Sequence, residues 1–196
     1  MSTGAAQSAH SSTALLVGHG SFLPALTCRS IVEDLRIRAW WQRSEVGEAG
    51  ESAVDLTSCR SLWCWLGDPY RRVVLRRLAE IARAVGTSGP RPRCEEPIVL
   101  RYMKGGFFKR HRDVYTRPEN AAGRRMSVVA FLTGQGEPGG FVGGELCLYP
   151  IDVDGGQSCV RVPGRAGQFV VFAADVEHEV FPVLAGQRMT LVSWLA

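Results

Sequence analysis

The chain has 196 residues, of which 45% are hydrophobic and 21% are charged, and its formal net charge is +4. This length fits one domain with a full hydrophobic core and leaves little room for two. The positive charge is small and is not gathered into a basic stripe, so we expect no nucleic-acid partner. No stretch approaches the roughly 18 apolar residues needed to cross a bilayer, and none has the pattern of a secretory signal. We therefore expect no membrane partner and a cytoplasmic location.

Two predicted helices precede the region that carries the candidate site. Residues 1–13 are rich in Ser, Ala and Gly and should form a flexible tail. Apolar residues recur at helical spacing after Thr27, which suits the N-cap of a first helix. Asp68-Pro69 suits the start of a second helix, and Gly86 suits its end. We expect this helical support, about 27–86, to place the arginines of the second helix in solvent.

The character of the sequence changes after residue 93, where short apolar runs alternate with Gly, Pro and Asp. Their lengths and spacing are typical of strands in a β-sandwich or barrel. The runs are residues 97–103, 126–133, 145–149, 159–162, 169–173, 179–183 and 189–195. Helices followed by strands predict one α+β, mainly β domain over 14–196, with the N-terminal helices packed on one sheet. The barrel core, about 97–196, should be a jelly roll.

The six cysteines bear on the redox compartment. They are Cys28, Cys59, Cys64, Cys94, Cys147 and Cys159. None forms a Cys-x-x-Cys pair, which argues against a structural zinc site. Most of them lie among apolar residues, so we expect buried free thiols in a reducing compartment.

His111 and Asp113 begin the candidate site. Alternate residues of a strand project to the same face, so an inward His-x-Asp pair delivers two ligands to one point. His178 would complete a set of two imidazoles and one carboxylate, which binds ferrous iron and leaves the opposite positions open. Taken alone, a His-x-Asp pair would equally suit a surface or a capping position. The later histidine favours a metal centre.

Arg188 follows His178 by ten positions and shares a strand face with Thr190. A guanidinium binds a carboxylate through two charge-assisted hydrogen bonds, and a nearby hydroxyl can add another. Without a metal centre, the simpler interpretation would be an arginine paired with Asp or Glu at the edge of the core. Beside such a centre, it predicts a site for an acidic co-substrate.

These residues lie in segments that resemble a known family. Residues 101–113 resemble the Tyr-x-x-Gly-x-x-x-x-x-His-x-Asp segment of prolyl 4-hydroxylase-like oxygenases, which use Fe(II) and 2-oxoglutarate. Residues 141–146 resemble their Gly-Gly-Glu-Leu turn, and 167–188 match their C-terminal signature in order and spacing. The resemblance covers about residues 20–196. It implies a double-stranded β-helix, the barrel of jelly rolls and cupins.

By position, the resemblance implies that His111, Asp113 and His178 ligate iron. Related halogenases have a small residue where Asp113 stands, so its carboxylate favours hydroxylation over halogenation. The implied reaction converts 2-oxoglutarate and O2 to succinate and carbon dioxide while an unactivated C–H bond is hydroxylated. We also expect ascorbate to serve as an additional reductant.

The resemblance also implies a co-substrate pocket. Arg188 would bind the distal carboxylate of 2-oxoglutarate, Thr190 would support it, and Tyr102 would donate its hydroxyl to the same anion. Tyr102 would equally suit a core aromatic whose hydroxyl is satisfied within the protein. Many prolyl hydroxylases have lysine where this chain has Arg188, a departure that leaves the substrate open.

The expected substrate is an amino acid, a short peptide or another small molecule. A prolyl hydroxylase acting on a protein, a cupin-like metal oxygenase without 2-oxoglutarate and a barrel that only binds ligands stay as alternatives. The glycine-rich segment 134–140 could be a lid or a hairpin connection, and an arginine of 114–125 could meet a substrate carboxylate. We expect all five tryptophans to pack the core: Trp40, Trp41, Trp63, Trp65 and Trp194. The sequence does not specify the oligomeric state.

Overall fold

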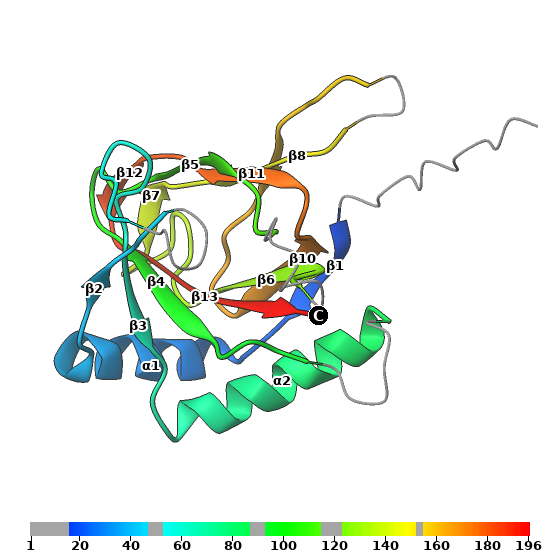
Figure 1. Ribbon diagram of the computed structural model, residues 1–196. Coiled ribbons are helices and arrows are strands. Elements are labelled where there is room, and N and C mark those ends of the chain that lie inside the picture. The colour runs from blue at the N-terminus through cyan, green and yellow to red at the C-terminus, as the bar shows by residue number, and fades with distance from the viewer. Residues whose placement is uncertain (1–15, 47–52, 87–92, 115–122, 152–154) are drawn as a thin grey trace, which may run out of the picture.

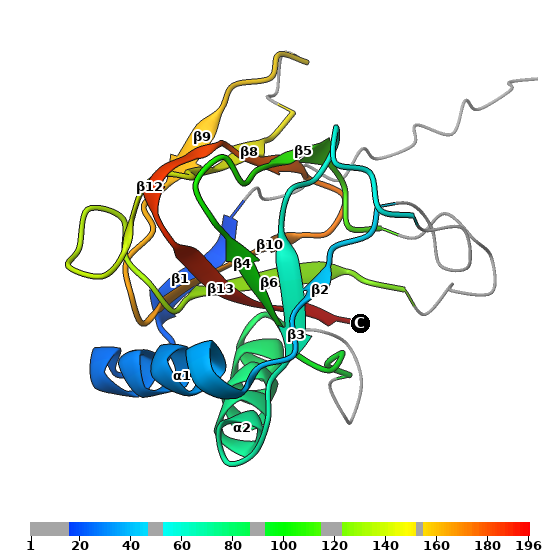
Figure 2. The ribbon, with the colours of Figure 1, turned by 90° about the vertical axis from the view of Figure 1, so that its left-hand side faces the viewer.

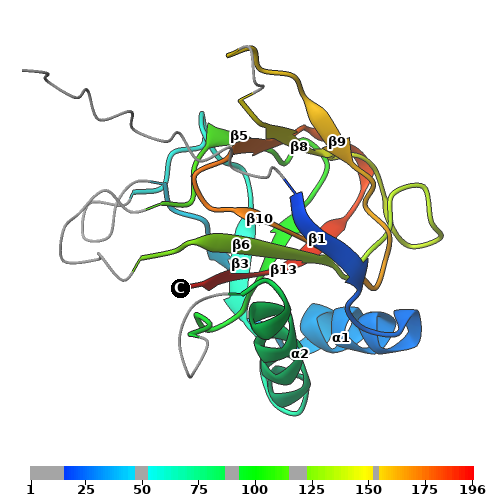
Figure 3. The ribbon, with the colours of Figure 1, turned by 90° about the vertical axis from the view of Figure 1, so that its right-hand side faces the viewer.

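Two facing β-sheets with a pair of helices beneath them make up this computed structural model (Figure 1). It describes residues 16–46, 53–86, 93–114, 123–151 and 155–196. In Figure 2 the smaller sheet lies above the larger one, and both helices cover the outer face of the larger sheet. Figure 3 shows the same order of layers from the opposite side. The α+β, mainly β class and the packing of the helices on one sheet are therefore confirmed.

The larger sheet has seven antiparallel strands in the order β1-β10-β6-β13-β4-β3-β2. Their bounds are β1 Leu16–Ser21, β10 Gln168–Ala173, β6 Met126–Phe131, β13 Arg188–Leu195, β4 Ile98–Tyr102, β3 Leu62–Trp65 and β2 Gln42–Arg43. The four-stranded sheet has the order β5-β11-β8-β9. Its bounds are β5 Phe108–His111, β11 Glu177–Val180, β8 Leu146–Tyr149 and β9 Val160–Val162. A third, two-stranded sheet pairs β12 Val183–Gly186 with β7 Phe141–Gly143.

The hydrophobic core is divided by the larger sheet. Strand β13 illustrates the division, because alternate residues point to opposite faces. Met189 and Leu191 join the core between the helices and the larger sheet, whereas Val192 belongs to the core between the two sheets. Arg188 and Thr190 share the inner face with Val192 and are buried there. The inner face of the larger sheet is thus where polar site residues meet an apolar environment.

Helix α1 spans Ala25–Arg38 and therefore begins three residues before the expected start. Pro24 occupies the N-cap, and no side chain caps the helix, so Thr27 lies inside the first turn. The prediction of a Thr27 cap was wrong because a proline also suits the entry to a helix, where its missing N–H needs no partner.

Helix α2 spans Tyr70–Ala84, close to its predicted bounds. It follows a cis Asp68–Pro69 bond. Pro69, rather than Asp68, is the N-cap, and the Asp68 carboxylate lies 3.6 Å from Arg72. Gly86 has φ +70, a conformation that glycine adopts without strain at the end of a helix. Neither described helix is long and apolar enough to span a membrane.

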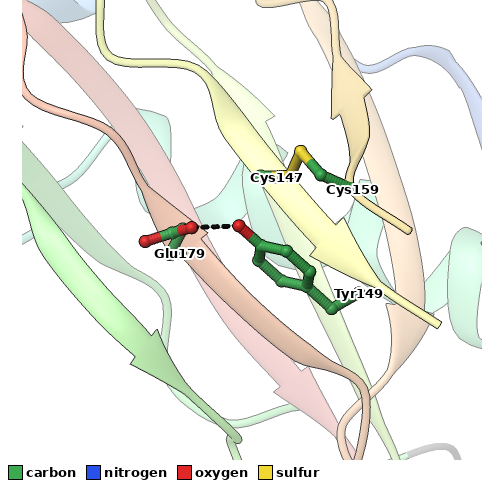
Figure 4. The surroundings of a disulfide bond; sticks show 4 residues. All are labelled: Cys147, Tyr149, Cys159 and Glu179. Atoms are coloured by element: carbon green, nitrogen blue, oxygen red, sulfur yellow. Dashed lines mark hydrogen bonds between the residues drawn. A yellow bond between two sulfur atoms is a disulfide. The ribbon is translucent and has the colours of Figure 1, made fainter. Parts of the chain in front are cut away.

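The expectation that all six cysteines are free was wrong for one pair. Cys147 and Cys159 form a disulfide with a Cα–Cα distance of 5.7 Å (Figure 4). The apolar neighbours Leu146 and Leu148 face the inter-sheet core, and strand alternation therefore turns Cys147 to the other face. There it meets Cys159, which is exposed just before β9. The other four cysteines are free. Three are buried, namely Cys28, Cys59 and Cys64, and Cys94 is half-buried.

Candidate active site

A cavity of about 660 Å³ lies between the two main sheets. Its wall contains all six residues singled out from the sequence: Tyr102, His111, Asp113, His178, Arg188 and Thr190. Strands β5 and β11 bring the two histidines from one side, whereas β4 and β13 bring the tyrosine, arginine and threonine from the other. The fold thus gathers the predicted metal ligands and the predicted co-substrate residues around one space.

His111 and His178 lie opposite each other in neighbouring antiparallel strands. Their ring centroids are 4.2 Å apart. Asp113 lies two residues beyond the end of β5, so the prediction that it shares a strand with His111 was wrong. The Asp113 N–H donates to the carbonyl of Ala174, at 2.9 Å, which anchors the chain just past the strand. The potential ligand atoms of the three residues all lie within 4.8 Å of one another.

The imidazoles are oriented by the backbone. The Nδ1 of His111 lies 2.8 Å from the carbonyl oxygen of Lys109, and the Nδ1 of His178 lies 3.0 Å from that of Val176. A carbonyl accepts, so each Nδ1 carries the proton and each Nε2 presents a lone pair. These Nε2 atoms lie 3.7 Å and 3.5 Å from the two carboxylate oxygens of Asp113. The arrangement leaves room for a cation between the three side chains.

Packing and one hydrogen bond hold the three side chains in place. The ring of Phe108 stacks on His111 at 3.8 Å, and Phe172 meets His178 edge-on at 4.9 Å. The buried hydroxyl of Ser127 donates to Asp113 Oδ2 at 2.6 Å. Such outer contacts orient ligands before a metal arrives.

The local electrostatics favour the protonation states that metal binding requires. Burial raises the pKa of the Asp113 carboxyl, but the two imidazoles and the Ser127 hydroxyl outweigh burial and hold that pKa below its usual range. Burial, assisted by the neighbouring His178, lowers the pKa of His111 to about 4. At neutral pH, Asp113 is therefore ionised and His111 is neutral, so neither needs to lose a proton to a metal.

Arg188 has no anionic partner among the described residues. Its side chain is 1% exposed, and only Nη1 makes a hydrogen bond, to the hydroxyl of Thr190 at 3.2 Å. Nε and Nη2 are buried without a partner in the described part of the chain. Burial lowers the pKa of Arg188 to about 10, against an opposing effect of Tyr102. Among the described residues, Arg188 therefore does not form the structural ion pair considered as the alternative. A buried unpaired cation requires an anionic ligand.

Tyr102 lies directly across from Arg188 in the register of β4 and β13. The guanidinium carbon is 5.1 Å from the Tyr102 ring centroid. Burial raises the pKa of the phenol, despite the nearby cation, so Tyr102 stays protonated and can donate a hydrogen bond. An anion that reaches Arg188 thus meets a guanidinium beside the Thr190 hydroxyl and the Tyr102 side chain, which fits the carboxylate of 2-oxoglutarate.

Sequence reasoning missed several residues in and around the cavity. Ser127 carried no signal beyond a polar residue in an apolar run. Trp65 was expected in the core but is 57% exposed and lines the cavity, as do the half-buried Trp63 and Trp194. Trp40 is 85% exposed outside the cavity, so the core prediction was wrong for it as well. For the two indoles of β3, the only available sequence signal was their alternation around Cys64, which indicates that they share a face.

The two segments suggested for substrate contacts differ in where they lie relative to the cavity. Residues 134–140 do not line this cavity, and they border a separate hollow beside α1 instead. Most of 114–125 lies outside the described residues. Arg124, which is described, lines the cavity, but it binds the Glu95 carboxylate at 2.6 and 2.8 Å and stacks on Trp194.

Comparison with known proteins gives the family. Residues 97–196, just over half of the chain, match the model of the 2OG-Fe(II) oxygenase superfamily. The chain belongs to this superfamily. The chain is 33% identical to a PKHD-type hydroxylase of Shewanella baltica over 101 residues, which are 50% of this chain and 42% of the relative. It is 30% identical to a PKHD-type hydroxylase of Nitrobacter winogradskyi over 133 residues, 66% of this chain and 55% of the relative. The chain thus spans about half the length of the curated relatives it matches.

Solved structures confirm the fold of the chain. A Pseudomonas putida prolyl-4-hydroxylase superposes with a TM-score of 0.62 at 24% identity, covering 91% of this chain and 90% of that one. The α-ketoglutarate-dependent epimerase SnoN from nogalamycin biosynthesis gives 0.64 at 16% identity, covering 90% and 76%. The expected double-stranded β-helix and the resemblance to prolyl 4-hydroxylase-like oxygenases are therefore confirmed.

Proposed function

We propose that this oxygenase is an Fe(II)- and 2-oxoglutarate-dependent dioxygenase that hydroxylates an unactivated C–H bond. The observation that carries the proposal is the unpaired guanidinium of Arg188, buried in the cavity that also holds the three potential metal ligands. A metal oxygenase that ignored 2-oxoglutarate would have no use for this cation. A binding module would have no use for three pre-oriented metal ligands.

His111, Asp113 and His178 would hold Fe(II) through two Nε2 atoms and one carboxylate oxygen, the facial set typical of such oxygenases. With O2 and 2-oxoglutarate, iron held there would supply the oxidation that turns C–H into C–OH and yields succinate and carbon dioxide. Ser127 would keep the carboxylate turned toward the metal. Because Asp113 fills the position of the third protein ligand, hydroxylation is favoured over halogenation.

Arg188 would bind the distal carboxylate of 2-oxoglutarate, with Thr190 and Tyr102 donating hydroxyl hydrogen bonds to it. All three are buried, so the ion pair would form away from water, where it is strongest. Ascorbate would serve as an additional reductant. An amino acid, a short peptide or another small molecule is the proposed substrate, since about 660 Å³ lies within the range of small-molecule sites.

The test uses the protein without oxygen. Addition of Fe(II) and 2-oxoglutarate should produce a visible metal-to-ligand charge-transfer band, and Asp113→Ala should lose both this band and substrate-dependent succinate formation. Asp175→Ala, which removes an exposed carboxylate from the turn before β11, is the matched control and should keep both. Absence of the band in the wild-type protein would refute the proposal, and hydroxylation by Asp113→Ala would refute the ligand assignment.

A further inference from the structure

The outer wall of the cavity is aromatic. In β3, Trp63 and Trp65 alternate with Cys64, whose side chain is buried in the core between the helices and the larger sheet. Both indoles therefore project to the opposite face, where they line the same cavity as the potential metal ligands. Their ring centroids are 5.2 Å apart and their planes are nearly perpendicular, at 89°. This edge-to-face contact gives the pair a defined shape.

Neighbouring strands extend the wall toward the site. The register of β3 and β4 sets Trp65 beside Ile98 and Trp63 beside Leu100, and all four line the cavity. Trp194, at the end of β13, lines it as well. Trp65 nevertheless leaves 57% of its surface in contact with solvent. A contiguous apolar surface of this kind, inside a cavity rather than scattered over the exterior, marks a place that a ligand covers.

The charged residues around this wall have partners within the protein. Glu95 accepts two hydrogen bonds from Arg124, and Glu96 accepts two from Arg71. The remaining charged residues of the outer cavity also have partners: Glu45 and Arg112. Charges paired in this way do not require a ligand of opposite charge. Arg188 does require one, and the distal carboxylate of 2-oxoglutarate would supply it.

We propose that Trp63 and Trp65 form the substrate subsite and that it takes an uncharged, apolar side chain or ring. A charged group there would lose its hydration against indole and aliphatic surface and find no unpaired counter-charge among the described residues. The subsite places the apolar group on β3 and leaves the adjoining part of the substrate facing the metal ligands. This inference rests on the proposed function for the role of the bound molecule as substrate, whereas the binding preference can be measured without turnover.

The experiment measures binding to protein loaded with Zn(II) and 2-oxoglutarate. Zn(II) accepts the same imidazole and carboxylate donors and has no redox chemistry, so nothing is consumed. Saturation-transfer NMR would follow four probes of similar size: the N-acetyl amides of L-proline, L-phenylalanine, L-aspartate and L-lysine. The two apolar probes should bind about tenfold more tightly than the two charged ones, the factor expected from burying one ring face.

Variants locate the effect. Trp65→Ala should weaken the apolar probes by about tenfold and leave the charged probes unchanged, whereas Trp65→Phe should retain most of the affinity. Trp40→Ala removes an even more exposed indole outside the cavity and should change nothing.

Equal affinity for all four probes, no binding of the apolar probes, or wild-type binding by Trp65→Ala would overturn the subsite. Those results leave the proposed function standing if the charge-transfer band forms with Fe(II). Conversely, loss of the band with preserved Trp65-dependent binding would refute the function and keep the subsite.

Discussion

Replacing Arg188 by Met should stabilise the ligand-free protein and abolish its response to 2-oxoglutarate. Burial lowers the pKa of this guanidinium from 12.5 to about 10. At about 1.4 kcal/mol per pKa unit, the unpaired charge costs on the order of 3 kcal/mol of folding free energy. Met keeps an unbranched apolar stem and removes the charge, while loss of the bond to Thr190 takes back about 1 kcal/mol. The net gain of ~2 kcal/mol corresponds to a rise in Tm of about 4–8 °C for a chain of this size.

Urea unfolding of the Zn(II)-loaded protein, with and without 2-oxoglutarate, measures both effects. At a ligand concentration a hundred times Kd, the wild-type protein should gain about 2.7 kcal/mol, and Arg188→Met should gain nothing. Arg101→Met is the matched control, because Arg101 lies next to Tyr102 on β4 but stacks on Trp41 outside the cavity. It should keep the full response to 2-oxoglutarate. An Arg188→Met variant that is less stable than the wild type without ligand, or that 2-oxoglutarate still stabilises, would refute the cost assigned to the buried charge or its role in binding 2-oxoglutarate.

Three further predictions concern the metal site and the disulfide. Ser127→Ala should weaken metal binding about 10–100-fold in a Co(II) titration, because Asp113 loses its orienting donor; Ser193→Ala, a buried serine bonded to a backbone carbonyl, should not. The pKa of His111 is lowered from 6.5 to about 4. Within that interval the unfolded chain binds more protons, so metal-free stability should fall by up to about 3 kcal/mol as pH drops through it. Urea titrations should show this slope flattened in His111→Gln; an unchanged slope would contradict the assignment. Alkylation of the unfolded protein should add four groups before reduction and six afterwards, and six without reduction would exclude the disulfide.

The order of chemical groups along the chain made much of the site predictable. An imidazole and a carboxylate two positions apart, a later imidazole and an arginine ten positions on give a pattern that survives small errors in strand bounds. Asp113 illustrates this, because it lies beyond β5 and still reaches the two histidines. The hydroxyl of Ser127 was not predictable, since its role depends on β6 lying beneath Asp113, a contact set by tertiary packing alone.

The fold was predictable where apolar runs are long and was missed where strands are short. Each predicted run falls on a strand, except that 179–183 includes the break between β11 and β12. Strands β2 and β7 have only two and three residues, and the glycines of β1 weaken its strand signal. The tryptophans of β3 show a deeper limit. Periodicity reveals that Trp63 and Trp65 share a face, but not whether that face meets a core or a ligand cavity.

Strand β11 is held in register by a neighbouring strand on each side. His178 is paired with His111 on one side and with Leu148 on the other, so both neighbours fix its register. Glu177 and Glu179 flank it and point to the opposite face of the sheet. A single insertion or deletion next to His178 would turn the side chains on one side of the change to the opposite face and could present a carboxylate where an imidazole now stands. Length variation among relatives that keep this centre should therefore be confined to the connecting segments outside β11.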